Sequence, residues 1–159
     1  MPVPAFIVEL RRMVGSTELW LPGVTAVVRR ADELLMVQRA DNHRWTPVTG
    51  IVDPGEEPAV AARREALEET GVEIRVDRLA QVAVVGPITY ANGDRTTYLD
   101  LVFACSWVAG EPHVADDESV AVGWFALDDL PPMEAGMLSR VRAGLAEEER
   151  ARFVSGPAT

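Results

Sequence analysis

The stretch GIVDPGE at residues 50–56, with REALEETGV following seven residues later at 64–72, decides the fold. Residues 57–70 are rich in Ala, Arg, Leu and Glu, which favour a helix. Gly71 stands where a helix commonly ends, because glycine adopts the left-handed conformation without strain. The glycines and the proline of the first run indicate a tight loop. The stretch therefore predicts a loop that leads into one central helix.

Three glutamates of this predicted helix are spaced so that they share a face. Glu65, Glu68 and Glu69 are related by three and four positions. Like charges at this spacing repel each other by about 0.2–0.5 kcal/mol per pair, and Arg64 relieves this only in part. Hard divalent cations prefer carboxylate oxygens, so the cluster suits such an ion. From these residues alone, a charged helix face in contact with water remains the simpler interpretation.

Together, the loop and the helix resemble the Nudix box, G-x5-E-x7-R-E-U-x-E-E-x-G-U, in which U is a bulky aliphatic residue. The resemblance extends from Gly50 to Val72 and favours a metal site over a plain charged helix. Ala66 stands where the pattern has a bulky aliphatic residue, which affects packing more than chemistry. The matching positions are Gly50, Glu56, Arg64, Glu65, Glu68, Glu69, Gly71 and Val72.

The resemblance implies a reaction and a cofactor. Nudix hydrolases cleave a nucleoside diphosphate linked to another moiety, X, by attack of water on phosphorus with Mg²⁺ or Mn²⁺. By this resemblance, Glu65, Glu68 and Glu69 are catalytic and hold the metal, and Arg64 orients them. Glu56 adds a ligand or holds the loop.

Two further metal ligands are expected outside the helix. The backbone carbonyl of Thr49, the residue before the box glycine, corresponds to a frequent ligand in the family. A positive φ at Thr49 would strain this β-branched residue. A fourth acid often precedes the last strand, and Glu118 is the candidate for catalysis or metal binding. Asp117 is its nearest competitor, and an ordinary acidic loop is the alternative.

The sequence does not identify the X moiety, but it offers candidate residues to bind the substrate. Arg39, Arg44 and Arg95 are candidates to bind phosphate, and Trp45 and Tyr90 are candidates to stack on a base. Core packing is an equally good interpretation of Trp45. ADP-ribose-like compounds, nucleoside triphosphates and dinucleoside polyphosphates all remain open as substrates.

The rest of the chain indicates one domain over residues 1–159. The pattern predicts a short N-terminal helix over 4–14 and a C-terminal helical tail over about 133–153. Turns are expected at 22–23 and throughout 40–55. The fold class is α/β (α+β), and the resemblance implies a Nudix-like α/β/α sandwich with a mixed sheet. The predicted strands are 18–21, 24–30, 34–39, 73–76, 79–85, 96–108 and 120–125.

Composition excludes several classes of protein. The formal net charge of −10 repels the phosphates of duplex nucleic acid, so no stable duplex binding is expected. No run of about 18 apolar residues is present, so no membrane span is expected, and the first ten residues do not form a signal peptide. The single cysteine excludes an internal disulfide and suggests the cytoplasm. A homodimer through the N-terminal helix and strand is compatible with the sequence.

These observations together predict a metal-dependent hydrolase that cleaves a pyrophosphate bond in a small nucleoside diphosphate derivative. The alternative is a catalytically silent module that keeps the Nudix fold and binds or senses nucleotides. The three intact glutamates favour the enzyme.

Overall fold

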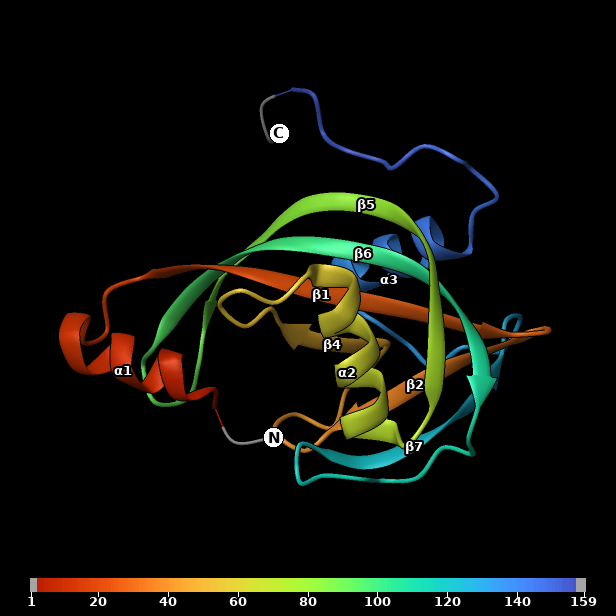
Figure 1. Cartoon of the computed structure of the whole chain (residues 1–159), viewed down its shortest axis with the longest axis horizontal. Coiled ribbons are helices and arrows are strands. Elements are labelled where there is room, and N and C mark those ends of the chain that lie inside the picture. Colours follow the sequence, from red (N-terminus) through yellow and green to blue (C-terminus); the bar gives the residue numbers. More distant parts are fainter. Residues whose placement is uncertain (1–2, 157–159) are drawn as a thin grey trace.

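The computed structural model describes residues 3–156 and consists of a mixed sheet with helices on both of its faces (Figure 1). The chain runs through ten elements in this order: α1 (Ala5–Val14), β1 (Leu19–Arg30), β2 (Glu33–Arg39), β3 (Trp45–Thr46), β4 (Val48–Ile51), α2 (Pro58–Thr70), β5 (Glu73–Thr89), β6 (Arg95–Ala109), β7 (Ser119–Ala126) and α3 (Ala135–Leu145).

The seven strands follow the order β3-β2-β1-β6-β5, with β4 paired to β1 and β7 paired to β2. β1 and β6 run parallel, from the pair Leu19 with Thr96 to the pair Arg29 with Ser106. The other pairings are antiparallel. The helix α2 covers one face and α3 covers the other, which confirms the predicted α/β/α arrangement (Figure 1).

The core divides into clusters that follow these layers. Alternate residues of β1 point to opposite faces, as a strand requires, so Val24, Ala26 and Val28 pack under α2 while Val27 packs under α3. A third, smaller cluster joins Ile7 of α1 to the start of β1. α1 therefore packs at one end of the sheet.

Two predicted breaks in strands are wrong. The expected turn at 22–23 lies inside β1, where an added Cβ on Gly23 would lie 3.4 Å from Tyr98 and 3.5 Å from Asp100. Gly23 thus gives close packing between strands and has no positive φ. The strands expected at 73–76 and 79–85 form one strand, β5, because shifts in its register with β6 absorb the irregular residues.

Two further expectations need correction. The loop expected over 40–55 contains the short strands β3 and β4. The helix expected over 133–153 ends at Leu145, because Arg78 of β5 donates hydrogen bonds to the carbonyls of Ala143 and Ala146. Beyond it the described chain is irregular, with bends at residues 146 and 149–150, and Arg152 pairs with the outer edge of β5. The helix predicted over 4–14 corresponds to α1.

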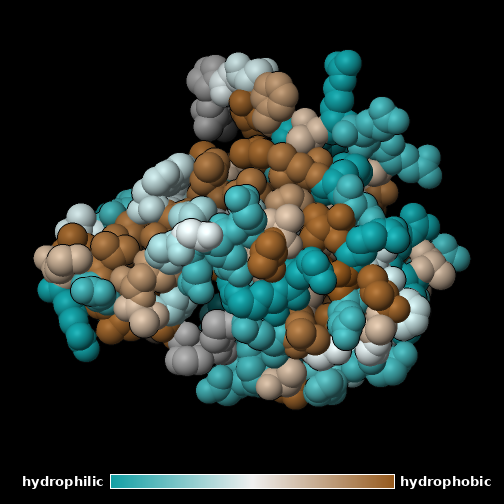
Figure 2. Space-filling view, viewed as in Figure 1, coloured by the Kyte–Doolittle hydropathy of each residue, from teal (hydrophilic) through white to brown (hydrophobic). Residues whose placement is uncertain are grey.

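In the face shown in Figure 2, hydrophilic residues lie over α2, and hydrophobic residues gather around α1 and along β5. Within residues 3–156, no helix has the length and apolar character needed to cross a membrane.

Candidate active site

The central helix α2 begins and ends where the sequence requires. Pro58 occupies its first turn, where the missing N–H of proline is harmless. Gly71 ends it in the left-handed conformation, with φ of 69°, and donates a backbone hydrogen bond of 2.9 Å to Leu67. Both ends confirm the predicted helix and fix which side chains face the sheet.

Gly50 lets the helix approach the neighbouring strand. In β4, Gly50 lies opposite Val24 of β1 and beneath Glu65 of α2. A Cβ built on Gly50 would lie 2.2–2.3 Å from three atoms of the Glu65 side chain. No other residue leaves that space, so the box glycine brings the Glu65 carboxylate against the strand that carries Thr49. Within the described residues, Ala31 and His43 are the non-glycine residues with positive φ, so Thr49 carries no such strain.

Arg64 uses all five of its N–H donors within the protein. Its Nε donates to Oε1 of Glu56 at 2.9 Å, and one terminal nitrogen donates to Oε2 of Glu56 and to the carbonyl of Ile51. The other donates to Glu65 at 2.9 Å and to Glu68 at 3.1 Å. The Arg64 guanidinium holds the pKa of Glu56 below its usual range. Arg64 is therefore a positioning residue with no donor left for a substrate.

Glu65 and Glu69 are both only 6% exposed. Burial raises the pKa of Glu69 to about 9, and the charges of Glu65, Glu118 and Asp116 add to this rise. Burial likewise raises the pKa of Glu65 to about 7, against the lowering effect of Arg64. Within the described part of the chain, Oε2 of Glu69 has no hydrogen-bond partner. Because a buried carboxylate without a partner is unfavourable, this pair fits a divalent cation.

The loop that carries the acids 116–118 is attached to the end of α2. His113 donates a backbone hydrogen bond of 3.0 Å to the carbonyl of Thr70, and Ala115 donates one of 3.3 Å to Glu69. These bonds explain why Asp116 and Glu118 influence the pKa of Glu69.

Glu68 is more exposed than this buried pair, with 41% of its side chain accessible, and it shares one terminal nitrogen of Arg64 with Glu65. Across residues 3–156, no three acidic, histidine or cysteine side chains already stand close enough to hold a metal ion. Complete coordination would thus need a rotated side chain or the Thr49 carbonyl, in addition to Glu65 and Glu69.

Two of the predicted substrate residues lie on the Glu69 side of the site. Arg39 forms a two-point ion pair with Asp41, at 2.9 and 2.8 Å, and lies close enough to Glu69 and Tyr90 for their charges to act on it. The Tyr90 hydroxyl is 2.7 Å from that of Tyr98. Tyr98 of β6 thus joins this group through its hydroxyl.

The other three are engaged elsewhere. Trp45 packs edge-on against Phe125, with ring centroids 4.7 Å apart, in the cluster under α3. Arg44 is exposed and paired with Glu134. Arg95 is paired with Glu18 at 3.1 Å, beside α1. The structure therefore does not bring these three together with the glutamates.

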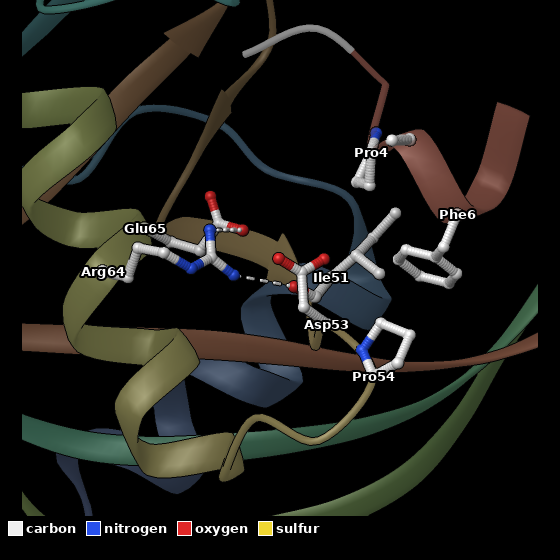
Figure 3. Close-up of a pocket in the computed structure, with 8 residues that line it drawn as sticks. Pro4, Phe6, Ile51, Asp53, Pro54, Arg64 and Glu65 are labelled. Carbon is white, nitrogen blue, oxygen red and sulfur yellow. Dashed lines mark hydrogen bonds and ion pairs between the residues drawn. The ribbon is translucent and has the colours of Figure 1, made fainter.

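A pocket of about 360 Å³ opens beside Glu65 and Arg64 (Figure 3). Its residues come from the start of α1, the end of β4, the loop that follows, and α2. They are Pro4, Ala5, Phe6, Ile51, Asp53, Pro54, Arg64 and Glu65. Sequence reasoning gave no role to Phe6 or Asp53, because nothing in the local pattern connects α1 with this loop.

Comparison with known proteins agrees with this geometry. A family model described as NUDIX domain matches residues 19–143. A MutT-like protein of Streptomyces ambofaciens is 36% identical over 104 residues, which cover 65% of this chain and 62% of that protein. The NAD-capped RNA hydrolase NudC of Pseudomonas aeruginosa is 33% identical over 119 residues, which cover 72% of this chain and 39% of that protein. The chain thus spans less than two thirds of either relative.

Among solved structures, a MutT NUDIX hydrolase from Burkholderia pseudomallei superimposes with a TM-score of 0.58 and 32% sequence identity. The alignment covers 78% of this chain and 97% of that one. The family model matches most of the chain, including the loop, α2 and the acids 116–118. The chain therefore belongs to the NUDIX domain family.

Proposed function

We propose that this protein is a Mg²⁺- or Mn²⁺-dependent hydrolase that cleaves the pyrophosphate bond of a nucleoside diphosphate derivative. The observation that carries the proposal is the buried pair Glu65 and Glu69, in which one Glu69 oxygen lacks a partner within the described residues. A structural acid at this depth would be paired with a cation or a hydroxyl. An acid kept without a partner beside other acids suits a ligand of positive charge.

Glu65 and Glu69 would hold the divalent ion, with Glu68, Glu118 and the Thr49 carbonyl as further ligands. When bound, such an ion neutralises the diphosphate and lowers the pKa of a water molecule. Arg64 acts on the substrate only indirectly, because its five donors hold Glu56, Glu65, Glu68 and the loop carbonyl in place.

On the substrate side, Arg39 and Tyr90 are the residues that we assign to binding, since Arg39 lies near Glu69 and Tyr90. Arg44, Trp45 and Arg95 receive no such role because other side chains engage them. The substrate is a small molecule. The single cysteine lies buried in β6, which suits a reducing compartment, and we place the reaction in the cytoplasm.

A substrate panel tests the proposal. The full chain is incubated with ADP-ribose, ATP or diadenosine tetraphosphate, with Mg²⁺ or Mn²⁺, and products are identified by mass. We expect turnover of at least one compound that depends on the metal. Glu69→Gln removes one ligand charge, and Glu73→Gln, at an exposed position at the start of β5, is the matched control. Nucleotide binding without turnover by the wild type would support the silent module instead.

A second comparison addresses the general base. If Glu118 is the base, Glu118→Gln lowers kcat with little change in KM and flattens the acid limb of the pH–rate profile. If Glu118 is a ligand, added Mn²⁺ partly restores activity. An active Glu118→Gln variant beside an inactive Asp117→Asn variant transfers the role to Asp117.

A further inference from the structure

We propose that the pocket at the start of α1 is the subsite for the X moiety, that X is an uncharged sugar ring, and that Phe6 is a specificity-determining residue. This inference rests on the proposed function, because the pocket matters only if the adjoining Glu65 takes part in cleavage. The pocket shares Glu65 and Arg64 with the candidate active site, so a group bound in it lies next to the reacting diphosphate (Figure 3).

The charges around the pocket exclude a phosphate. The one cationic side chain in its lining is Arg64, whose five donors are all committed. The remaining charged groups are the carboxylates of Asp53 and Glu65. The proposed metal ion would offset the charge of Glu65, but a terminal phosphate of a nucleoside triphosphate in this pocket would still meet the Asp53 carboxylate with no free protein donor to offset the repulsion. The occupant is therefore not an anion.

The polar groups favour an occupant that donates hydrogen bonds. The backbone of Asp53 is held by Glu56, whose N–H donates to the Asp53 carbonyl at 3.0 Å and whose carboxylate accepts from the Asp53 N–H at 3.2 Å. The Asp53 carboxylate accepts no hydrogen bond from any residue in the described range 3–156 and lines the pocket. A fixed acceptor of this kind suits the hydroxyl groups of a sugar.

The remaining residues of the pocket form apolar walls against which a sugar ring can pack. Pro4 and Phe6 face Ile51 and Pro54 across the pocket (Figure 3). A volume of about 360 Å³ lies at the small end of the range for ligand sites, about 300–1,000 Å³. Apolar walls with a few fixed polar groups are the usual composition of such sites. This volume accommodates one sugar ring.

The wall formed by α1 is fixed to the sheet. Arg11 donates to the carbonyl of Arg95 at 2.7 Å and to the hydroxyl of Thr96 at 3.2 Å, and Ile7 is buried against β1. Phe6 is therefore held in position before a ligand arrives, which lowers the entropy lost on binding.

Kinetics with two matched substrates test the inference. ADP-ribose is compared with the β-methyl ester of ADP, which has the same diphosphate diester and a methyl group in place of the sugar. In the wild type, we expect kcat/KM for ADP-ribose to exceed that for the methyl ester at least about tenfold. Phe6→Ala should lower this ratio about tenfold. Asp53→Asn should lower it severalfold and tests the acceptor without shortening a packed side chain.

Val8→Ala is the matched control, because Val8 is an exposed apolar residue of α1 that does not line the pocket. It should leave the ratio unchanged, and thermal melting verifies that each variant is folded. If the wild type shows similar kcat/KM values for ADP-ribose and the methyl ester, the inference is overturned. It is also overturned if Asp53→Asn lowers kcat/KM equally for both substrates, because that result would indicate that the pocket holds the adenosine. If the wild type cleaves no diphosphate at all, the proposed function fails instead, so the two failures are distinguishable.

Discussion

Asp100 and Glu69 are two acids buried to a similar depth, 4% and 6% exposed, on opposite faces of the sheet. Asp100 accepts hydrogen bonds of 3.1 and 2.9 Å from the Thr25 hydroxyl, and Nε of Arg140 from α3 lies 3.6 Å from it. Among residues 3–156, Oε2 of Glu69 has no hydrogen-bond partner, and the charges of Glu65, Glu118 and Asp116 raise its pKa more than Arg39 lowers it.

On the proposed function, the difference separates an acid that serves the fold from an acid that serves a ligand. Burial raises the pKa of both acids, but Arg140 and Thr25 oppose the rise at Asp100. The fold thus stabilises one ionised acid with its own residues and leaves the other to be stabilised from outside. Four changes test this distinction, starting with the largest expected effect.

Glu69→Gln should abolish most activity and leave the fold at least as stable. The amide keeps the shape but removes a ligand charge, so kcat/KM should fall about a thousandfold, equal to about 4 kcal/mol. Above about pH 9, where Glu69 of the metal-free wild type is ionised, the variant should gain about 1 kcal/mol in the free energy of unfolding, because it lacks this unpaired buried charge. Steady-state kinetics and urea denaturation measure both. A loss of stability equal to the loss of activity would make Glu69 a structural acid like Asp100.

Asp100→Ala should destabilise the protein by about 3 kcal/mol, because it leaves the buried charge of Arg140 without a counter-charge and with only the Thr25 hydroxyl as a partner. Denaturant unfolding measures the loss. The double variant Asp100→Leu with Arg140→Met should recover most of it, since apolar residues replace the whole ion pair. A single variant as stable as the wild type would show that the pair contributes nothing.

Without a metal, stability should fall as pH rises. A carboxyl whose folded pKa is raised binds a proton that the unfolded chain releases, so its stabilising contribution is complete below the ordinary value of 4.5 and disappears as pH passes the folded value of about 9. We expect a progressive loss of stability over this range. Millimolar Mg²⁺ should restore stability at the alkaline end. Melting curves recorded across this pH range, with and without Mg²⁺, measure this loss. If stability depends on pH equally in the wild type and in Glu69→Gln, Glu69 is not the group responsible.

Arg64→Lys should have the smallest effect of the four, a decrease of about tenfold in kcat/KM, or about 1.4 kcal/mol. Lysine keeps the charge, but its three donors cannot reproduce the planar fork that holds Glu56 and Glu65. Arg63→Lys, at an exposed position next to it, is the matched control. Equal kinetics for the two variants would mean that the fork geometry is unimportant.

The sequence predicted the loop, α2 and its glutamates well, because their positions follow from local spacing. Glu65 and Glu69, four residues apart, do share the buried face. Glu68, predicted with them, is more exposed and shares one terminal nitrogen of Arg64 with Glu65. Spacing alone does not show which of two neighbouring faces the sheet will cover.

The parts that sequence reasoning missed depend on contacts between distant elements. Arg140 and Asp100 meet only because α3 packs across β6, and neither lies in a recognisable pattern. The predicted helix at the C-terminus was too long for a similar reason. Glu148 and Arg152 have the spacing of a helical ion pair, but Arg152 forms backbone hydrogen bonds with the edge of β5, so this segment is not helical. Tertiary contacts override local preference here.

The parallel pairing of β1 with β6 also determines when the site comes into existence. Leu19 pairs with Thr96, so the intervening chain, α2 included, forms one long loop whose closure carries an entropy penalty. Before this closure, Glu65 and Glu69 are hydrated, ionised and apart. The cation that we propose between them would therefore recognise only the finished fold, and it would slow unfolding while leaving the rate of folding almost unchanged. The lifetime of the native protein would then depend on the supply of metal.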